Sequence, residues 1–270
     1  MSFQPIIPMS GLGGWAFLNA TRDNQTEAFE QSPTIRRDTD YFEAKIGEID
    51  SAESLVSDRR LLRVALGAFG LQEDLDNRFL IRRILEGGVE AEDSLANKLA
   101  DDRYKTMAAT FGFGDGAPPS TQREGFGAEI TAKFRDISFE VAVGDQDESL
   151  RLAMNAEREL SEMAQERPEN DDALWFRIMG TPPLRKVFEV ALGLPGSFAQ
   201  LDLDRQLEVF KDRSESQLGI ARLSDLADTE VLDGLVERYL LRDQIAQTQA
   251  QSSNAIALTL LQQAPQRISF

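Results

Sequence analysis

The feature that most constrains the fold is an eleven-residue apolar stretch that occurs twice. Residues 61–71 read LLRVALGAFGL, and residues 184–194 read LRKVFEVALGL. Each copy has the pattern of a helix with apolar residues on nearly all sides, which predicts burial, and each ends at a glycine suited to a left-handed cap. The identical positions of a gapless alignment are Leu61 and Leu184, Val64 and Val187, Ala68 and Ala191, Gly70 and Gly193, and Leu71 and Leu194.

A second, shorter similarity places the two copies in similar surroundings. The tripeptide Leu-Ala-Asp ends at Asp101 in the first half and at Asp228 in the second, and a helical pattern follows each time. Each half thus contains the apolar helix, a middle helix and a helix headed by this tripeptide. Repeated units of this kind usually stack about a shared core. We expect an all-α fold of two duplicated helical units packed as one body, with mobile N- and C-terminal tails.

Glycine and proline divide the chain into five segments. Residues 1–38 are predicted to be a flexible N-terminal tail, because glycines and prolines between Pro5 and Gly14 interrupt any regular element. Residues 39–111 form the first unit, residues 112–127 a Gly/Pro-rich linker, and residues 128–243 the second unit. Residues 244–270 are predicted to be a polar tether followed by an apolar C-terminal segment.

The start of the second unit has an ambiguous pattern. Between Ile130 and Val143 the apolar residues fit both the alternation of a strand and the spacing of a helix. No turn residue interrupts residues 128–143, and the sequence offers no second strand for pairing. We therefore predict a helix here.

The charge balance limits the kinds of partner. The chain has 46 Asp and Glu residues against 29 Lys and Arg residues, a formal net charge of −17. Such a chain is repelled by nucleic acid and anionic lipid headgroups, and no basic block offsets the charge. The chain contains no run of about 18 apolar residues, which is the length that a membrane-spanning helix needs. We expect protein partners, no nucleic acid and no membrane insertion, and the oligomeric state stays open.

The absence of Cys and His removes most catalytic and metal-binding arrangements. Without them there is no thiol nucleophile, no thiolate metal site, and neither the commonest general base nor the commonest zinc ligand. An enzyme would have to use carboxylates and Lys. We expect no enzymatic activity, no cofactor and no metal. The first cation is Arg22, so no secretory signal is indicated, and we expect cytoplasmic synthesis without a cleaved signal.

Paired acidic residues are the remaining candidates for chemistry. They sit at or just before predicted helix starts, where carboxylates cap free N–H groups and complement the helix dipole. We interpret them as caps rather than as acid–base pairs, which would need a cleft and separated pKa values. The pairs are Asp101 and Asp102, Asp145 to Glu148, Asp171 and Asp172, and Asp202 and Asp204.

Two apolar clusters in polar surroundings are candidate partner-binding sites. Each cluster either packs onto the body of the protein or binds a partner, as docking motifs and groove-binding helices do. The sequence leaves both interpretations open. The N-terminal residues are Trp15, Phe17 and Leu18, and the C-terminal residues are Ile256, Leu258, Leu260 and Leu261.

Several motifs of the second half occur in a specific order. They are FEVAVG at 139–144, RLAMNAEREL at 151–160, WFRIMGTPPLR at 175–185, ALGLP at 191–195 and LDLDRQ at 201–206. This order resembles an uncharacterised bacterial family numbered 1217 among the domains of unknown function. Residues 40–42 and 57–71 resemble its other block. The family has no known catalytic residues, and its members, common in alphaproteobacteria, are often encoded beside flagellar genes.

The resemblance implies an association with the flagellum. We therefore expect a non-enzymatic structural or assembly protein of the bacterial flagellum that acts through protein–protein contacts. One alternative is a cytoplasmic chaperone or regulator that binds a single flagellar component. A remote alternative is a carboxylate-based hydrolase.

Overall fold

The computed structural model describes the backbone of residues 3–114, 116, 118–166 and 171–263, with side chains up to residue 250. This described part is helical and contains no strand, so the all-α prediction is confirmed. The α-helices are α1 (Gly11–Glu30), α2 (Pro33–Lys45), α3 (Ala52–Ser57), α4 (Arg59–Gly67), α5 (Arg78–Gly87), α6 (Leu95–Lys98), α7 (Asp102–Phe111), α8 (Phe126–Gly144), α9 (Glu148–Met163), α10 (Asp172–Gly180), α11 (Pro182–Ala191), α12 (Leu203–Leu218) and α13 (Thr229–Gln263).

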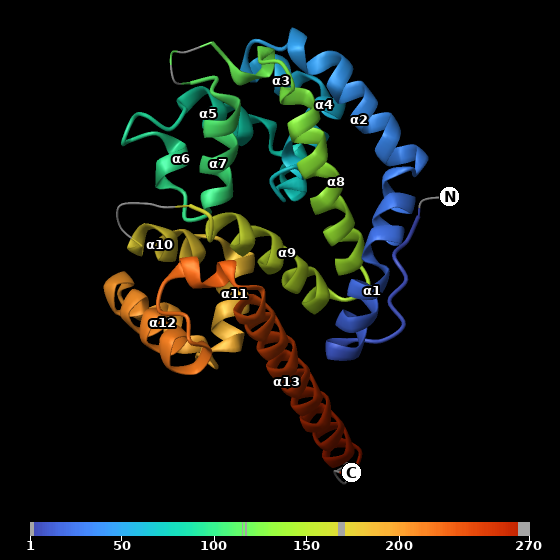
Figure 1. The fold of residues 1–270 in the computed structure, drawn as a ribbon, viewed down its shortest axis with the longest axis vertical. Helices are drawn as coiled ribbons and strands as arrows, with labels where there is room; N and C mark the ends of the chain where they lie inside the picture. The colour runs from blue at the N-terminus through green and yellow to red at the C-terminus, as the bar shows by residue number, and fades with distance from the viewer. Residues whose placement is uncertain (1–2, 115, 117, 167–170, 264–270) are drawn as a thin grey trace, which may run out of the picture.

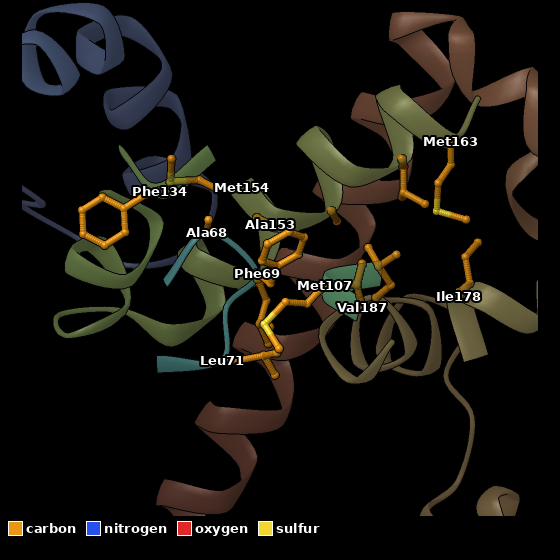
Figure 2. Packing of buried hydrophobic residues seen from close by; sticks show 14 of the residues in the cluster. Ala68, Phe69, Leu71, Met107, Phe134, Ala153, Met154, Met163, Ile178 and Val187 are labelled. Atoms are coloured by element: carbon orange, nitrogen blue, oxygen red, sulfur yellow. The ribbon is translucent and has the colours of Figure 1, made fainter. Parts of the chain in front are cut away.

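The helices form two groups that share one core. Helices α2 to α8 lie in one group and α9 to α13 in the other, while α1 packs against α8, α9 and α13 and so connects the groups (Figure 1). Figure 2 shows part of the core, in which Leu71 and Met107 from the first group cluster with Ala153 and Val187 from the second. The groups therefore pack as one body. That one unit is a duplicate of the other remains a prediction.

The two apolar stretches form α4 and α11, and both helices end in the same way. Gly70 and Gly193 adopt left-handed conformations, with φ of 67° and 62°. In each copy the next residue closes the helix end: Leu71 N donates to Leu66 O over 2.9 Å, and Leu194 N donates to the carbonyl five residues before it over 2.8 Å. This bond satisfies a carbonyl that the helix itself leaves free. The predicted glycine caps are therefore confirmed.

The helix starts of the two copies differ. Asp58 caps α4, and its Oδ1 accepts hydrogen bonds from Arg60 N at 2.8 Å and Leu61 N at 3.1 Å. Helix α11 begins instead at Pro182, whose fixed φ suits the first helical position and whose missing N–H leaves no donor to satisfy.

The ambiguous segment at the start of the second unit is helix α8, as predicted. Ile130, Phe134 and Ile137 recur at helical spacings and are buried on one side of α8, which packs against α2, α4 and α9. The helical spacing prevails over the strand-like alternation because this face is covered by other helices.

The prediction of a flexible N-terminal tail is wrong. Residues 11–30 form α1, because burial of Trp15, Leu18 and Phe29 stabilises a helix that its glycines alone would weaken. The preceding segment is also anchored. The buried side chain of Gln25 accepts a hydrogen bond from Ile6 N at 2.6 Å and donates to Ile6 O at 3.2 Å.

The prediction of a polar tether from residue 244 is also wrong. Helix α13 continues without a break to Gln263. Residues 235–263 contain neither Gly nor Pro, and Gln and Ala favour helix. The polar segment is therefore helical rather than irregular.

Candidate functional site

A cleft lies where the two groups of helices meet. Its volume is about 710 Å³. The end of the first apolar stretch contributes Gly70 and Leu71, and the second contributes Lys186 near the start of α11. Residues 72–74, residues 182–183 and parts of α7, α8 and α9 also line it. The two similar stretches thus both contribute to one cleft.

Two polar groups of this cleft are held by bonds within the first group of helices. Arg103 donates to both oxygens of Asp101 and to Gly70 O at 2.5 Å. Tyr104 Oη donates to Asp74 Oδ2 at 2.6 Å, and burial together with this bond raises the pKa of Tyr104 to about 12. Other polar groups of the lining are not paired in this way, because the buried Oε1 of Gln72 has no hydrogen-bond partner.

A smaller cavity of about 120 Å³ lies between α7, α8 and α9. Four carboxylates and four cations line it, so its charges are balanced. Burial raises the pKa of both Asp102 and Asp136. An acid–base pair needs carboxylates whose environments push their pKa values apart. Burial raises both pKa values here, so it does not create the difference in pKa that an acid–base pair needs.

A buried ion pair lies beside this cavity. Glu140 in α8, with a side chain only 5% exposed, accepts from Arg158 Nε of α9 at 2.6 Å. Burial nevertheless raises the pKa of Glu140, because desolvation of its charge outweighs the attraction of Arg158. The pair links α8 to α9 and leaves no free carboxylate for catalysis at this position.

The paired acids act as helix caps, as the sequence predicted, at three of the four places. Asp101 accepts from Arg103 N at 3.0 Å, Asp147 from Ser149 N at 2.9 Å, and Asp202 from Arg205 N at 2.9 Å. Asp171 does not cap α10; instead its Oδ2 accepts from the buried Trp175 Nε1 at 2.9 Å. In the described part of the chain, no three acidic residues are grouped so that they could hold a metal ion.

The N-terminal candidate residues do not form an accessible site. Trp15 and Leu18 are 6% and 0% exposed and belong to the core, so the docking interpretation is wrong for these two residues. Phe17 lies on the outer side of α1 and is 36% exposed. The reason is helical geometry: residues 15 and 18 share one face of α1, and residue 17 points away from it.

The C-terminal candidate residues lie on the part of α13 that leaves the body (Figure 1). The backbone there is helical, and the side chains of Ile256, Leu258, Leu260 and Leu261 lie outside the described residues. Every described side chain from Gln244 to residue 250 is exposed. Gln247 still bonds Ser149 of α9, and the described side chains that follow it are exposed.

Sequence reasoning missed the exposed apolar residues at the point where α13 leaves the body. Leu241 and Ile245 are 47% and 48% exposed and lie one turn apart. The start of α1 reaches this point, because a Cβ atom on Gly11 would lie 2.6 Å from Gln244 Oε1. Leu12, next in sequence, is 36% exposed. A signal was present in the sequence: residues 244–263 contain no charged residue.

Comparison with known proteins gives a family and a fold. The model of the family described as "Protein of unknown function (DUF1217)" matches residues 68–232. The X-ray crystal structure of protein AGR_C_984 from Agrobacterium tumefaciens is similar to this chain, with a TM-score of 0.71 and 22% sequence identity. The similarity covers 90% of this chain and 99% of that one. No curated protein matches the chain. No helix of the described residues combines the length and apolar character that crossing a membrane requires.

Proposed function

The chain belongs to the DUF1217 family of proteins of unknown function, and we propose that it is a non-enzymatic interaction protein that binds a partner through the projecting part of α13. The observation that supports this function is the form of that helix. It leaves the body at the exposed residues Leu241 and Ile245 and continues to Gln263 with no charged residue after Asp243.

Most of the stability of a helix in a protein comes from packing against neighbours rather than from intrinsic helix propensity. The projecting part of α13 gains little from ion pairs, since it carries no charges. Its apolar residues, and the pair Leu241 and Ile245, gain free energy only when another surface covers them. A partner that supplies an apolar groove or a second helix fits this requirement.

The flagellar association rests on the family resemblance, and we propose the partner to be a flagellar component. The bonds of Arg103 and Tyr104 support the non-enzymatic part of the proposal, because they give these two cleft residues a structural role. The smaller cavity with its balanced charges supports it too, since burial raises the pKa of both Asp102 and Asp136.

A truncation tests the proposed function. Ending the chain after Gln247 removes the projecting helix but keeps the bonds of Asp243 and Gln247 to Ser149 of α9. We expect the truncated protein to melt like the full chain yet fail to restore swimming in a flagellated host that lacks its own copy. Full motility with the truncated chain would contradict the proposal.

A matched pair of double variants distinguishes loss of the partner contact from loss of the helix itself. Leu241→Gln with Ile245→Gln removes the exposed apolar pair, whereas Leu201→Gln with Leu203→Gln changes a pair that is 42% and 57% exposed elsewhere. Only the first double variant should impair motility.

Fractionation of cells distinguishes the two forms of the proposed role. A structural protein is found in purified flagella, and a chaperone or regulator stays in the cytoplasm.

A further inference from the structure

A cluster of arginines in the first group of helices has an unusual charge arrangement. The carboxylate of Asp38 in α2 is 3% exposed and faces three guanidinium groups. Arg63 Nη1 donates to its Oδ2 at 3.2 Å, and Arg37 and Arg60 each lie 3.8 Å from its Oδ1. That buried Oδ1 has no hydrogen-bond partner. One carboxylate therefore faces three guanidinium groups, and it forms a hydrogen bond with Arg63 alone among them.

Two other arginines of the described residues have the opposite balance. Arg82 and Arg158 each face two carboxylates, as expected for a chain with a net charge of −17. At Asp38 the excess is positive. Asp58 lies nearby, but its oxygens accept from Tyr41 Oη and from two backbone N–H groups of α4. With the charge of Asp58 counted, three guanidinium groups face two carboxylates, so the cluster keeps a local excess of one positive charge on an acidic protein.

The guanidinium group of Arg60 is held in place, and all three guanidinium groups reach the solvent. Arg60 stacks on the ring of Tyr41, with its Cζ 3.8 Å from the ring centroid, and donates to Arg37 O at 3.0 Å. Tyr41 is itself fixed by its 2.6 Å bond to Asp58. The side chains of Arg37, Arg60 and Arg63 are 67%, 38% and 41% exposed. Groups that are fixed before binding lose little conformational freedom when a ligand arrives.

From these contacts we propose that Arg37, Arg60 and Arg63 form a docking surface for a carboxylate-rich segment of a protein partner. Planar guanidinium groups bind carboxylates through two parallel hydrogen bonds. Arg60 and Arg63 stand about one helical turn apart on α4, and Arg37 extends the row onto α2. Such a row matches several carboxylates along a peptide better than it matches one compact anion. A polyanion as large as nucleic acid would meet the repulsion of the whole acidic molecule.

This surface is separate from the projecting helix. Helices α2 and α4 lie at the end of the molecule opposite to the C-terminal part of α13 (Figure 1). The inference does not rest on the proposed function of α13. Two surfaces at opposite ends would allow the protein to connect an acidic partner with the partner of α13.

Fluorescence anisotropy of the full chain tests the proposal with a labelled octaglutamate peptide, and octaglutamine is the uncharged control. The wild-type protein should bind octaglutamate and not octaglutamine, with an affinity that falls as salt is added. Arg37→Gln with Arg60→Gln should weaken binding by about tenfold or more. Arg37→Gln alone changes the most exposed of the three residues and should also weaken the binding of octaglutamate. This single variant tests the proposal if the double variant does not fold.

The matched control is Arg123→Gln with Arg205→Gln. These side chains are 57% and 56% exposed, and each is paired with one carboxylate, Glu129 and Glu208. They should change the affinity by less than about twofold, because exposed pairs contribute little. The proposal is overturned if the wild type does not bind octaglutamate, if the control variant loses as much affinity as the cluster variant, or if a phosphoserine peptide or anionic vesicles bind the cluster more tightly than octaglutamate does.

Discussion

Replacing Gly67 by alanine tests how closely α4 packs against α8. Gly67 ends α4, and a Cβ atom there would lie 2.6 and 2.7 Å from Cδ2 and Cε2 of Phe134. Phe134 is 6% exposed, so its ring has little room to move. Alanine favours a helix interior by about 1 kcal/mol over glycine, but overpacking a core costs about 1–3 kcal/mol. Because Gly67 is at a helix end, the steric cost prevails, and we expect a loss of about 1 kcal/mol.

Gly234 in α13 provides the matched control. It is exposed inside the helix, and a Cβ atom there meets no heavy atom within 4 Å. Gly234→Ala should therefore raise the free energy of unfolding by about 0.5–1 kcal/mol. Urea unfolding followed by circular dichroism measures both changes, provided that the slope with denaturant stays constant.

A double variant identifies the cause. If the ring of Phe134 is what opposes the new methyl group, Phe134→Leu should cost less in the Gly67→Ala background than alone, with a coupling above about 0.5 kcal/mol. The reasoning is refuted if Gly67→Ala stabilises the protein as Gly234→Ala does, or if the two substitutions are additive.

Three further predictions concern burial, capping and titration. Leu66 and Leu192 are 0% and 1% exposed, so replacing either by Asp buries a charge and lowers the free energy of unfolding by several kcal/mol. This loss is comparable with a whole stability of about 5–15 kcal/mol. A native thermal melt of either variant would contradict the burial. Asp202→Ala removes the cap of α12 and should cost about 1 kcal/mol in urea unfolding; an unchanged midpoint would argue against the cap. Burial raises the pKa of Asp102, which penalises its charged form in the folded state. As the pH falls through the raised pKa, the wild type should gain stability relative to Asp102→Asn, and parallel melting temperatures from pH 7 to pH 4 would count against this.

Much of the body was predictable because its signals are local. A glycine after an apolar helix predicts a left-handed cap, and Gly70 and Gly193 both form one. An aspartate before a helix predicts a cap, and Asp58 and Asp202 act in this way. Such features depend on a few neighbouring residues and on the geometry of one helix end.

The two ends of the chain were not predictable from the same signals. Glycine at residues 11, 13 and 14 indicated a loop, but contacts of Trp15 and Leu18 with distant helices stabilise α1. Polar composition after Asp243 indicated a tether, although Gln and Ala are compatible with helix. The arginine cluster at Asp38 also escaped sequence reasoning, since Arg37, Arg60 and Arg63 come together only when α2 packs on α4.

The central claim is that the protein contacts a partner where α13 leaves the body. Its most direct test is a photo-crosslinking amino acid placed at Ile245 in cells, with the same amino acid at Phe79 as the control, since Phe79 is 72% exposed in the other group of helices. Our account predicts a specific crosslink to a flagellar component from position 245 and none to that component from position 79. No crosslink from position 245, or the same products from both positions, would contradict it.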